Sequence, residues 1–284
     1  MQDDPAEAPL EAEPTPRSDL PMRIVSGIVL SIIALGALWA GPKPFGALVL
    51  LAGIVMSWEW GRIVRGSEFD LAFIIHAGAL IVAFGLAAFG FAALGLAVLL
   101  AGAITMIPLQ FGETGLLSAA GVLYTGLPAL SLLWLRGDEP HGFLAALFIL
   151  VLVAVTDTAA YAAGRLIGGP RLWPRVSPNK TWSGLIGGVS ASAVAGALFA
   201  YYAGGPIATL AMSGFLLGLT AQGGDLAESA LKRRFGVKDA SNLIPGHGGV
   251  LDRLDGVVAV AVAAALFALL ADPSAPAKAL LFGN

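Results

Sequence analysis

The chain has no cysteine, so disulfide bonds and thiolate-bound metals are excluded. Histidine is nearly as scarce, because only His76, His141 and His247 occur, and a zinc site built from several histidines is therefore not expected. Charge is the third scarcity, since Asp, Glu, Lys and Arg together make up 12% of the 284 residues. A chain with so few charged side chains is poorly suited to a surface that faces water on all sides.

What the chain has in quantity is apolar sequence: 57% of its residues are hydrophobic, and its mean hydropathy is +0.82. Long apolar runs bounded by charge, Gly or Pro predict an all-α polytopic membrane protein with about nine transmembrane helices in one bundle. The predicted spans lie near residues 24–40, 45–60, 71–88, 90–107, 115–135, 142–163, 184–203, 206–223 and 254–271.

Basic residues divide unevenly between the two faces that such a bundle presents to water. With an odd number of spans, only Lys43, Arg136 and Lys278 of the sixteen Lys and Arg residues fall on the face opposite the N-terminus. The positive-inside rule then places the N-terminus and the basic loops near 164–183 and 224–253 in the cytoplasm.

We divide the chain into three regions. Residues 1–22 are rich in acidic residues and proline and predict a disordered cytoplasmic tail. Residues 23–140 are expected to form the N-terminal transmembrane helices, and residues 141–284 the C-terminal helices with the two long basic loops. The run 24–40 is expected to be an uncleaved anchor, because the sequence before it is acidic, whereas a secretory signal begins with a basic region.

Much of the remaining charge gathers in one window, residues 225–255. Asp225, Glu228, Ser229 and Lys232 recur at steps of three and four and are expected on one face of a helix. Acidic groups there could hold a hard cation, and basic groups could neutralise a polyanion, so the window indicates phosphate chemistry beside a membrane.

Two more carboxylates, Asp252 and Asp255, would project together if the next helix begins near Leu251. A Gly-rich loop precedes them, and with Asp225 they could enclose one or two cations, for which magnesium is the natural candidate. His247 lies in this loop. It could hydrogen-bond a phosphate, act as a base, or simply hold the loop by a structural hydrogen bond.

The second basic loop follows Asp157, a carboxylate at the end of an apolar run that either faces a polar cavity or lies at the membrane interface. Within the loop, Ser177, Lys180 and Thr181 could donate hydrogen bonds to phosphate oxygens. The spacing of a phosphate-binding P-loop is absent, so that motif is rejected. A basic loop lying on anionic lipid is the alternative.

The order of these residues resembles the signature of phosphatidate cytidylyltransferases, also called CDP-diacylglycerol synthases. The resemblance covers residues 156–255, through the segments TDTAAYAAGR, SPNKTW and GDLAES and the signature that follows. That signature is Ser229-x-Leu231-Lys232-Arg233, then Lys238-Asp239, then Pro245-x-His247-Gly248-Gly249-x-x-Asp252-Arg253-x-Asp255. One departure is Ser183, at a position where many relatives are acidic.

The resemblance implies transfer of CMP from CTP to phosphatidate with Mg²⁺ as cofactor, giving CDP-diacylglycerol and pyrophosphate in phospholipid biosynthesis. The expected catalytic residues are Asp225, Lys232, Asp252 and Asp255, and the three aspartates are also the expected magnesium ligands. The expected contacts to substrate or phosphate are Ser177, Lys180, Thr181, Ser229, Arg233, Lys238, His247, Gly248, Gly249 and Arg253.

The expected partners are CTP, phosphatidate and membrane lipid, with no nucleic acid, and a homodimer is left open. The protein is expected in the inner membrane of a bacterial-type cell, with the active site facing the cytoplasm. One alternative is a CTP-dependent transferase or kinase that acts on another lipid, such as an isoprenoid phosphate or alcohol. From a different class, the intramembrane acids could be the ion sites of a secondary transporter.

Overall fold

The computed structural model describes residues 20–283. They form α1 (Leu20–Ala40), α2 (Pro42–Arg65), α3 (Leu71–Ala88), α4 (Ala92–Gln110), α5 (Gly112–Gly137), α6 (Gly142–Leu166), β1 (Arg171–Trp173), β2 (Ser177–Thr181), α7 (Trp182–Ala203), α8 (Ile207–Arg234), α9 (Leu251–Ala271) and α10 (Pro276–Phe282). Most of the acidic tail predicted for residues 1–22 lies outside the described residues, and positions 20–22 belong to the start of α1.

The predicted all-α polytopic architecture is confirmed. Eight of the described helices, α2 to α9, are long and apolar enough to cross a membrane. The apolar part of α1, Ile24–Ala40, is shorter. The predicted spans therefore correspond in order to α1 through α9. Helix α9 begins at Leu251, three residues before the predicted span, which is the condition under which Asp252 and Asp255 were expected to project together.

Two helices run further than the apolar pattern predicts. α2 continues to Arg65 and α8 continues to Arg234, and each carries basic residues in its last turn. Positive charge is favourable there because it faces the negative end of the helix dipole. The polar residues therefore mark where the apolar stretch ends, while the helix itself continues. The apolar pattern also does not predict the antiparallel hairpin β1–β2 or the short helix α10.

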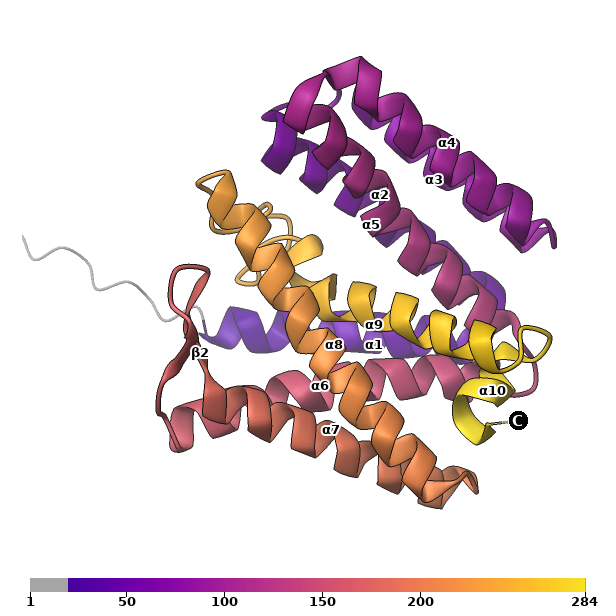
Figure 1. Ribbon diagram of the computed structural model, residues 1–284, viewed down its shortest axis with the longest axis vertical. Coiled ribbons are helices and arrows are strands. Elements are labelled where there is room, and N and C mark those ends of the chain that lie inside the picture. Colours follow the sequence, from indigo (N-terminus) through magenta and orange to yellow (C-terminus); the bar gives the residue numbers. More distant parts are fainter. Residues whose placement is uncertain (1–19, 284) are drawn as a thin grey trace, which may run out of the picture.

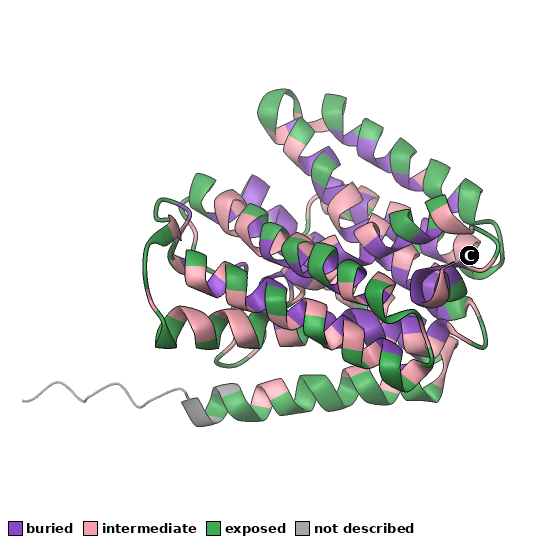
Figure 2. Cartoon of the chain, turned by 60° about the horizontal axis from the view of Figure 1, so that its bottom comes forward, coloured by how far each residue is buried: buried purple, intermediate pink, exposed green. Residues whose placement is uncertain are grey.

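The helices form two groups that meet along α5, α2 and α9 (Figure 1). One group contains α2, α3, α4 and α5, and the other contains α6, α7, α8, α9 and α10. Helix α1 packs on α2 and α6, and most of its length is exposed (Figure 2). Exposed apolar residues of this kind are the expected surface of a protein whose solvent is lipid.

Helices α7 and α8 approach each other backbone to backbone. A Cβ atom added at Gly196 would meet the carbonyl oxygen of Leu210, and one added at Gly214 would meet the carbonyl oxygen of Ser192. Small residues permit such close contact between helices in lipid. This packing sets the charged end of α8 beside the start of α7 and the hairpin.

A separate apolar cluster joins the N-terminal helices to the signature segment. Met56, Trp60 and Ile63 of α2 are buried against Leu251 and Val258 of α9. The loop between α8 and α9 also packs here, through residues 235, 237, 240 and 250. The signature segment is therefore held from the side of α2 as well as by its own two helices.

Candidate active site

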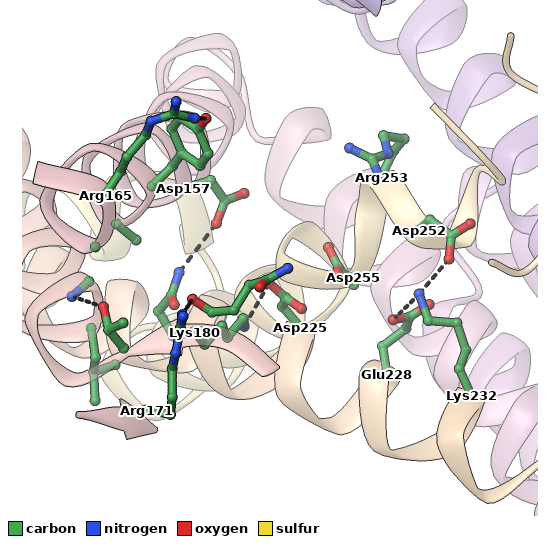
Figure 3. Close-up of a pocket in the computed structure, with 18 of the residues that line it drawn as sticks. Asp157, Arg165, Arg171, Lys180, Asp225, Glu228, Lys232, Asp252, Arg253 and Asp255 are labelled. Carbon is green, nitrogen blue, oxygen red and sulfur yellow. Dashed lines mark hydrogen bonds and ion pairs between the residues drawn. The ribbon is translucent and has the colours of Figure 1, made fainter. Parts of the chain in front are cut away.

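A polar cavity of about 880 Å³ opens where the end of α6, the hairpin, the start of α7, the second half of α8 and the start of α9 meet. Figure 3 shows the charged side chains that surround it. The acidic lining residues are Asp157, Asp225, Glu228, Asp239, Asp252 and Asp255, and the basic ones are Arg165, Arg171, Lys180, Lys232 and Arg253. A cavity with both signs of charge suits a polyanion together with a cation.

Lys180 links the hairpin to α8. Its Nζ lies 2.7 Å from Oδ2 of Asp225, and Ser229, one turn further along α8, donates to Oδ1 of the same carboxylate at 3.3 Å. The neighbouring Thr181 caps α7 by accepting a hydrogen bond of 3.0 Å from the backbone N–H of Gly184. The end of β2 is thereby fixed, and its lysine is directed into the cavity (Figure 3).

Lys232 forms a second ion-pair centre in the last turn of α8. Its Nζ lies 2.8 Å from Oε2 of Glu228 and 2.6 Å from Oδ1 of Asp252, and all three side chains are buried. The buried lysine is the positive partner of both carboxylates, so a change that removes the lysine is strongly disfavoured.

Asp252 also holds the loop that precedes it. Its carboxylate accepts hydrogen bonds from the backbone N–H of Ala240, at 3.2 and 3.0 Å, and from that of Gly249, at 2.7 Å. Gly248 lies close by at φ +83, and a Cβ atom there would lie 2.7 Å from Oδ2 of Asp252. The glycine therefore allows both the left-handed turn and the approach of the carboxylate.

The remaining acids form a group on the α6 side of the cavity. Asp157 accepts a hydrogen bond of 3.3 Å from Nε2 of Gln222, and Asp255 accepts one of 2.7 Å from the backbone N–H of Gly256. Asp157, Asp225 and Asp255 all line the cavity, so three negative side chains face the same space. Such a group of like charges is stabilised by a cation bound among them.

The donor set fits magnesium in its chemistry. The lining offers several carboxylate oxygens, the ligand type that Mg²⁺ takes in proteins, and its other positions can be filled by water and phosphate oxygens. Over residues 20–283, no three His, Cys, Asp or Glu side chains already converge on a common point. An ion would therefore draw one or two carboxylates together with its other ligands.

The structure brings together part of the predicted site. Lys180, Thr181, Asp225, Lys232, Asp252, Arg253 and Asp255 all line the cavity. Other predicted residues lie outside the lining: Ser177, Ser229, Arg233, Lys238, His247, Gly248 and Gly249. Asp225 and Asp252 therefore line the same cavity, and each is paired with a different lysine.

Two of the outlying residues, Arg233 and His247, connect separate segments of the chain. Arg233 donates to the carbonyl oxygens of Val176 at 3.3 Å and Val237 at 3.4 Å, so it ties the hairpin to the end of α8. Nδ1 of His247 lies 2.6 Å from Oγ of Ser26, which connects the Gly-rich loop to α1. Ser183, the departure from the family pattern, donates to the carbonyl oxygen of Gly168 at the base of the hairpin.

Several lining residues have no role that the sequence patterns indicate, among them Gln222, Asn179 and Tyr161. Glu59, a buried carboxylate of α2 that contacts the signature loop, is also absent from the predicted site. A single acid within an otherwise apolar span is a signal that could have drawn attention to Glu59.

Three cavity arginines remain available for anions. Arg165 donates to the hydroxyl of Tyr161 at 2.8 Å, and Arg171 donates to the carbonyl oxygen of Asn179 at 3.0 Å. In the described part of the chain, neither these two nor Arg253 belongs to an ion pair. Their guanidinium groups therefore carry the uncommitted positive charge of the cavity.

The fold and the cavity together define an integral-membrane enzyme equipped to handle phosphate groups. Residues 21–271 match the model of the cytidylyltransferase family, and the chain belongs to that family. It is 42% identical over 270 residues to a phosphatidate cytidylyltransferase from Brucella suis, an alignment that covers 91% of this chain and 97% of the relative. The enzyme of the same name from Bacillus subtilis is 31% identical over 253 residues, covering 84% and 93% of the two chains.

Proposed function

We propose that this protein is a phosphatidate cytidylyltransferase, which transfers CMP from CTP to phosphatidate and releases CDP-diacylglycerol and pyrophosphate. The observation that carries the proposal is the cavity itself: the chain matches enzymes of this name over most of its length, and the residues that resemble their signature supply much of the charged lining.

In the proposed reaction an oxygen of the phosphatidate phosphate attacks the α-phosphorus of CTP. A new P–O bond forms, the bond from the α-phosphorus to the bridging oxygen breaks, and pyrophosphate leaves with that electron pair. Because the attacking phosphate is already ionised near neutral pH, no strong base is required. The protein has to bring two polyanions together and stabilise the charge that develops on the leaving group.

The uncommitted guanidinium groups suit this task. Arg165 and Arg171 approach the cavity from α6 and the hairpin, and Arg253 approaches it from α9. A guanidinium can bind two phosphate oxygens at once, so arginines on opposite sides could orient both substrates. Lys180 adds a positive charge where the hairpin meets α8.

Magnesium is proposed as the cofactor. When bound, it neutralises phosphate charge and polarises the phosphorus centre under attack. Asp225 and Asp255 are the proposed first ligands, because both lie in the group of carboxylates that face the same space. Asp252, the third predicted ligand, would have to exchange one of its present donors, Lys232 or a loop N–H, for the ion.

The cavity is proposed to face the cytoplasm of a bacterial-type inner membrane, with the N-terminus on the same side. The concentration of basic residues in the segments around the cavity supports this orientation. Phosphatidate would then enter sideways from the inner leaflet. A homodimer stays a prediction, which the particle mass measured in nanodiscs would test.

The proposed function is tested with purified protein in phosphatidate-containing vesicles. With radiolabelled CTP and Mg²⁺, label from the α-phosphate should move into a lipid-soluble product and pyrophosphate should appear in equal amount. Transfer of the α-label to lipid only when an isoprenoid phosphate replaces phosphatidate would indicate a transferase for another lipid. Transfer of label from the γ-phosphate of CTP to an isoprenoid alcohol would indicate a lipid kinase. Intact CTP together with solute movement across sealed vesicles would indicate a transporter.

A further inference from the structure

We propose that Glu59 is a positioning residue for this reaction. It lies on α2, outside the cavity and outside the signature, and holds the loop and helix end that carry Asp252 and Asp255. The inference rests on the proposed function, and it gives the N-terminal helices a role in the active site beyond that of scaffold.

Glu59 is completely buried and makes three hydrogen bonds to the signature segment. Its Oε1 accepts from the hydroxyl of Ser241 at 2.6 Å and from the backbone N–H of Val250 at 2.9 Å. Its Oε2 accepts from the backbone N–H of Leu251 at 2.6 Å. Both oxygens are therefore engaged by a segment far away in the sequence.

Two of these donors belong to the start of α9. The first N–H groups of a helix have no partner within the helix and need an acceptor. Val250, the N-cap residue of α9, provides no side-chain cap. Glu59 supplies the acceptor from α2, and its negative charge is favourable at the positive end of the helix dipole.

Glu59 and Asp252 both accept hydrogen bonds at each end of the loop, near residues 240–241 and 249–251. At the first end, Glu59 binds Ser241 and Asp252 binds Ala240. At the second end, Asp252 binds Gly249, while Glu59 binds the two N–H groups that follow. At each end of the loop, one residue is bound by Asp252 and the next by Glu59. A shift of the Glu59 carboxylate would therefore also move the residues that Asp252 binds.

The space around Glu59 is closed. A Cβ atom at Gly249 would collide with Oε1 of Glu59, so a glycine is needed at this position of the signature for the carboxylate to approach. Apolar side chains of α2, α9 and the loop surround the contact. In the described part of the chain, no Lys or Arg forms an ion pair with Glu59. The backbone and hydroxyl donors therefore compensate for the burial of its charge.

These contacts determine where Asp252 and Asp255 enter the cavity. Both lie within the first turns of α9, whose start is held by Glu59 through Val250 and Leu251. A shift of this helix start by about 1 Å is enough to cost on the order of a hundredfold in rate when it misplaces reacting groups. Lys180 and Arg171 lie on the hairpin and do not depend on Glu59.

The decisive variant is Glu59→Gln, which keeps the size of the side chain. The carbonyl oxygen of glutamine can accept the hydrogen bonds made to only one of the two carboxylate oxygens. Its amide N–H₂ then faces the N–H or O–H donors that bonded to the other oxygen. Glu68→Gln is the matched control, because it removes the same negative charge just beyond the end of α2. The side chain of Glu68 is half-exposed and paired with Arg62. Ser241→Ala removes one of the three bonds and provides an intermediate case.

Two readouts are compared on protein that remains folded in nanodiscs. We expect Glu59→Gln to lower kcat by about tenfold to a hundredfold, with the KM for CTP within about threefold of the parent. Hydrogen exchange of a peptide covering residues 249–254 should become faster, while peptides of α3 and α4 are unchanged. Ser241→Ala should show a smaller change of both kinds, and Glu68→Gln should behave like the parent.

The inference is overturned if Glu59→Gln keeps the parent kcat, or if exchange rises equally in every helix, which would mean general destabilisation. It is also overturned if kcat falls while exchange at residues 249–254 stays at the parent rate. Failure of the proposed function is a separate result: the parent protein would not form the lipid product, although the exchange comparison would still report whether Glu59 holds the loop.

Discussion

Lys180 on β2 and Asp225 on α8 form an ion pair with an N–O distance of 2.7 Å that joins the two basic segments into one site. Neither segment lines the cavity alone, because the hairpin brings the lysine and α8 brings the carboxylate. The pair also places a positive charge beside the acidic group of Asp157, Asp225 and Asp255. Lys180 is therefore placed to exchange between a carboxylate and a substrate phosphate.

Replacing Lys180 with alanine should lower kcat/KM by on the order of a hundredfold. The change removes a phosphate partner and leaves Asp225 with unbalanced negative charge, and a charged hydrogen bond of this kind contributes about 1.5–3 kcal/mol. Steady-state kinetics with both substrates would measure the effect. Lys43→Ala, at an exposed lysine at the start of α2, is the control, and parent-like kinetics of Lys180→Ala would exclude its role at the site.

Asp252→Asn should abolish turnover while the protein remains in the membrane. The amide loses the ion pair with Lys232, and its N–H₂ group faces the loop N–H donors. Several kcal/mol of lost transition-state stabilisation corresponds to a rate lower by on the order of a thousandfold or more. Single-turnover assays on equal amounts of inserted protein would measure it, and near-normal turnover would contradict a catalytic role for Asp252.

The signature and the structure lead to different expectations for Lys238→Ala. The signature predicts a phosphate contact, and hence a raised KM with little change in kcat. Lys238 is exposed and lies outside the cavity lining, so the structure leads us to expect a KM within about twofold of the parent. A KM for CTP or phosphatidate raised tenfold would show that the loop carries Lys238 into contact with substrate.

The start of α3 offers a test of stability away from the cavity. Asp70 accepts hydrogen bonds from Nε of Arg65 at 2.8 Å and from the backbone N–H of Phe73 at 2.7 Å. Burial alone would raise the pKa of Asp70, but the bonds from Arg65 and Phe73 outweigh it and lower the pKa to about 2. The carboxylate therefore contributes stability above its unfolded pKa of about 4, and this contribution is lost as pH falls toward 2.

Asp70→Ala removes both the cap and the partner of Arg65, whose side chain is 3% exposed. Loss of a helix cap costs about 1 kcal/mol, and the unpaired arginine adds to this. Thermal unfolding in detergent at pH 7 should show a lower Tm for the variant, and the difference should shrink between about pH 4 and pH 2. A difference that does not change with pH would mean that the charge of Asp70 is not responsible.

The sequence predicts the membrane helices because their signal is local. Whether an apolar run can cross lipid depends only on its own length and composition. Each of α2 to α9 meets this condition independently of the others. The shared helix face of Asp225 and Lys232 is predictable for the same reason, since spacing along one helix fixes it. Both line the cavity.

Contacts between distant segments could not be predicted in this way. The bonds from Glu59 to Val250 and Leu251 depend on how α2 packs against α9, and no periodicity in either segment encodes them. The hairpin could not be predicted from apolar periodicity, because its strands are short and rich in polar residues. For His247 the sequence left open a base, a phosphate contact or a structural hydrogen bond, and it could not indicate the contact with Ser26 of α1 that the structure shows.

The glycine-mediated contact between α7 and α8 limits where mutations could change the lipid preference of the enzyme. At Gly196 and Gly214 the two main chains touch directly, so there is no side chain at that seam whose trimming would let the helices separate. Attempts to admit bulkier headgroups are better aimed at the turn of the hairpin, residues 174–176, because exchanging the strands would remove Lys180 and the Thr181 cap of α7.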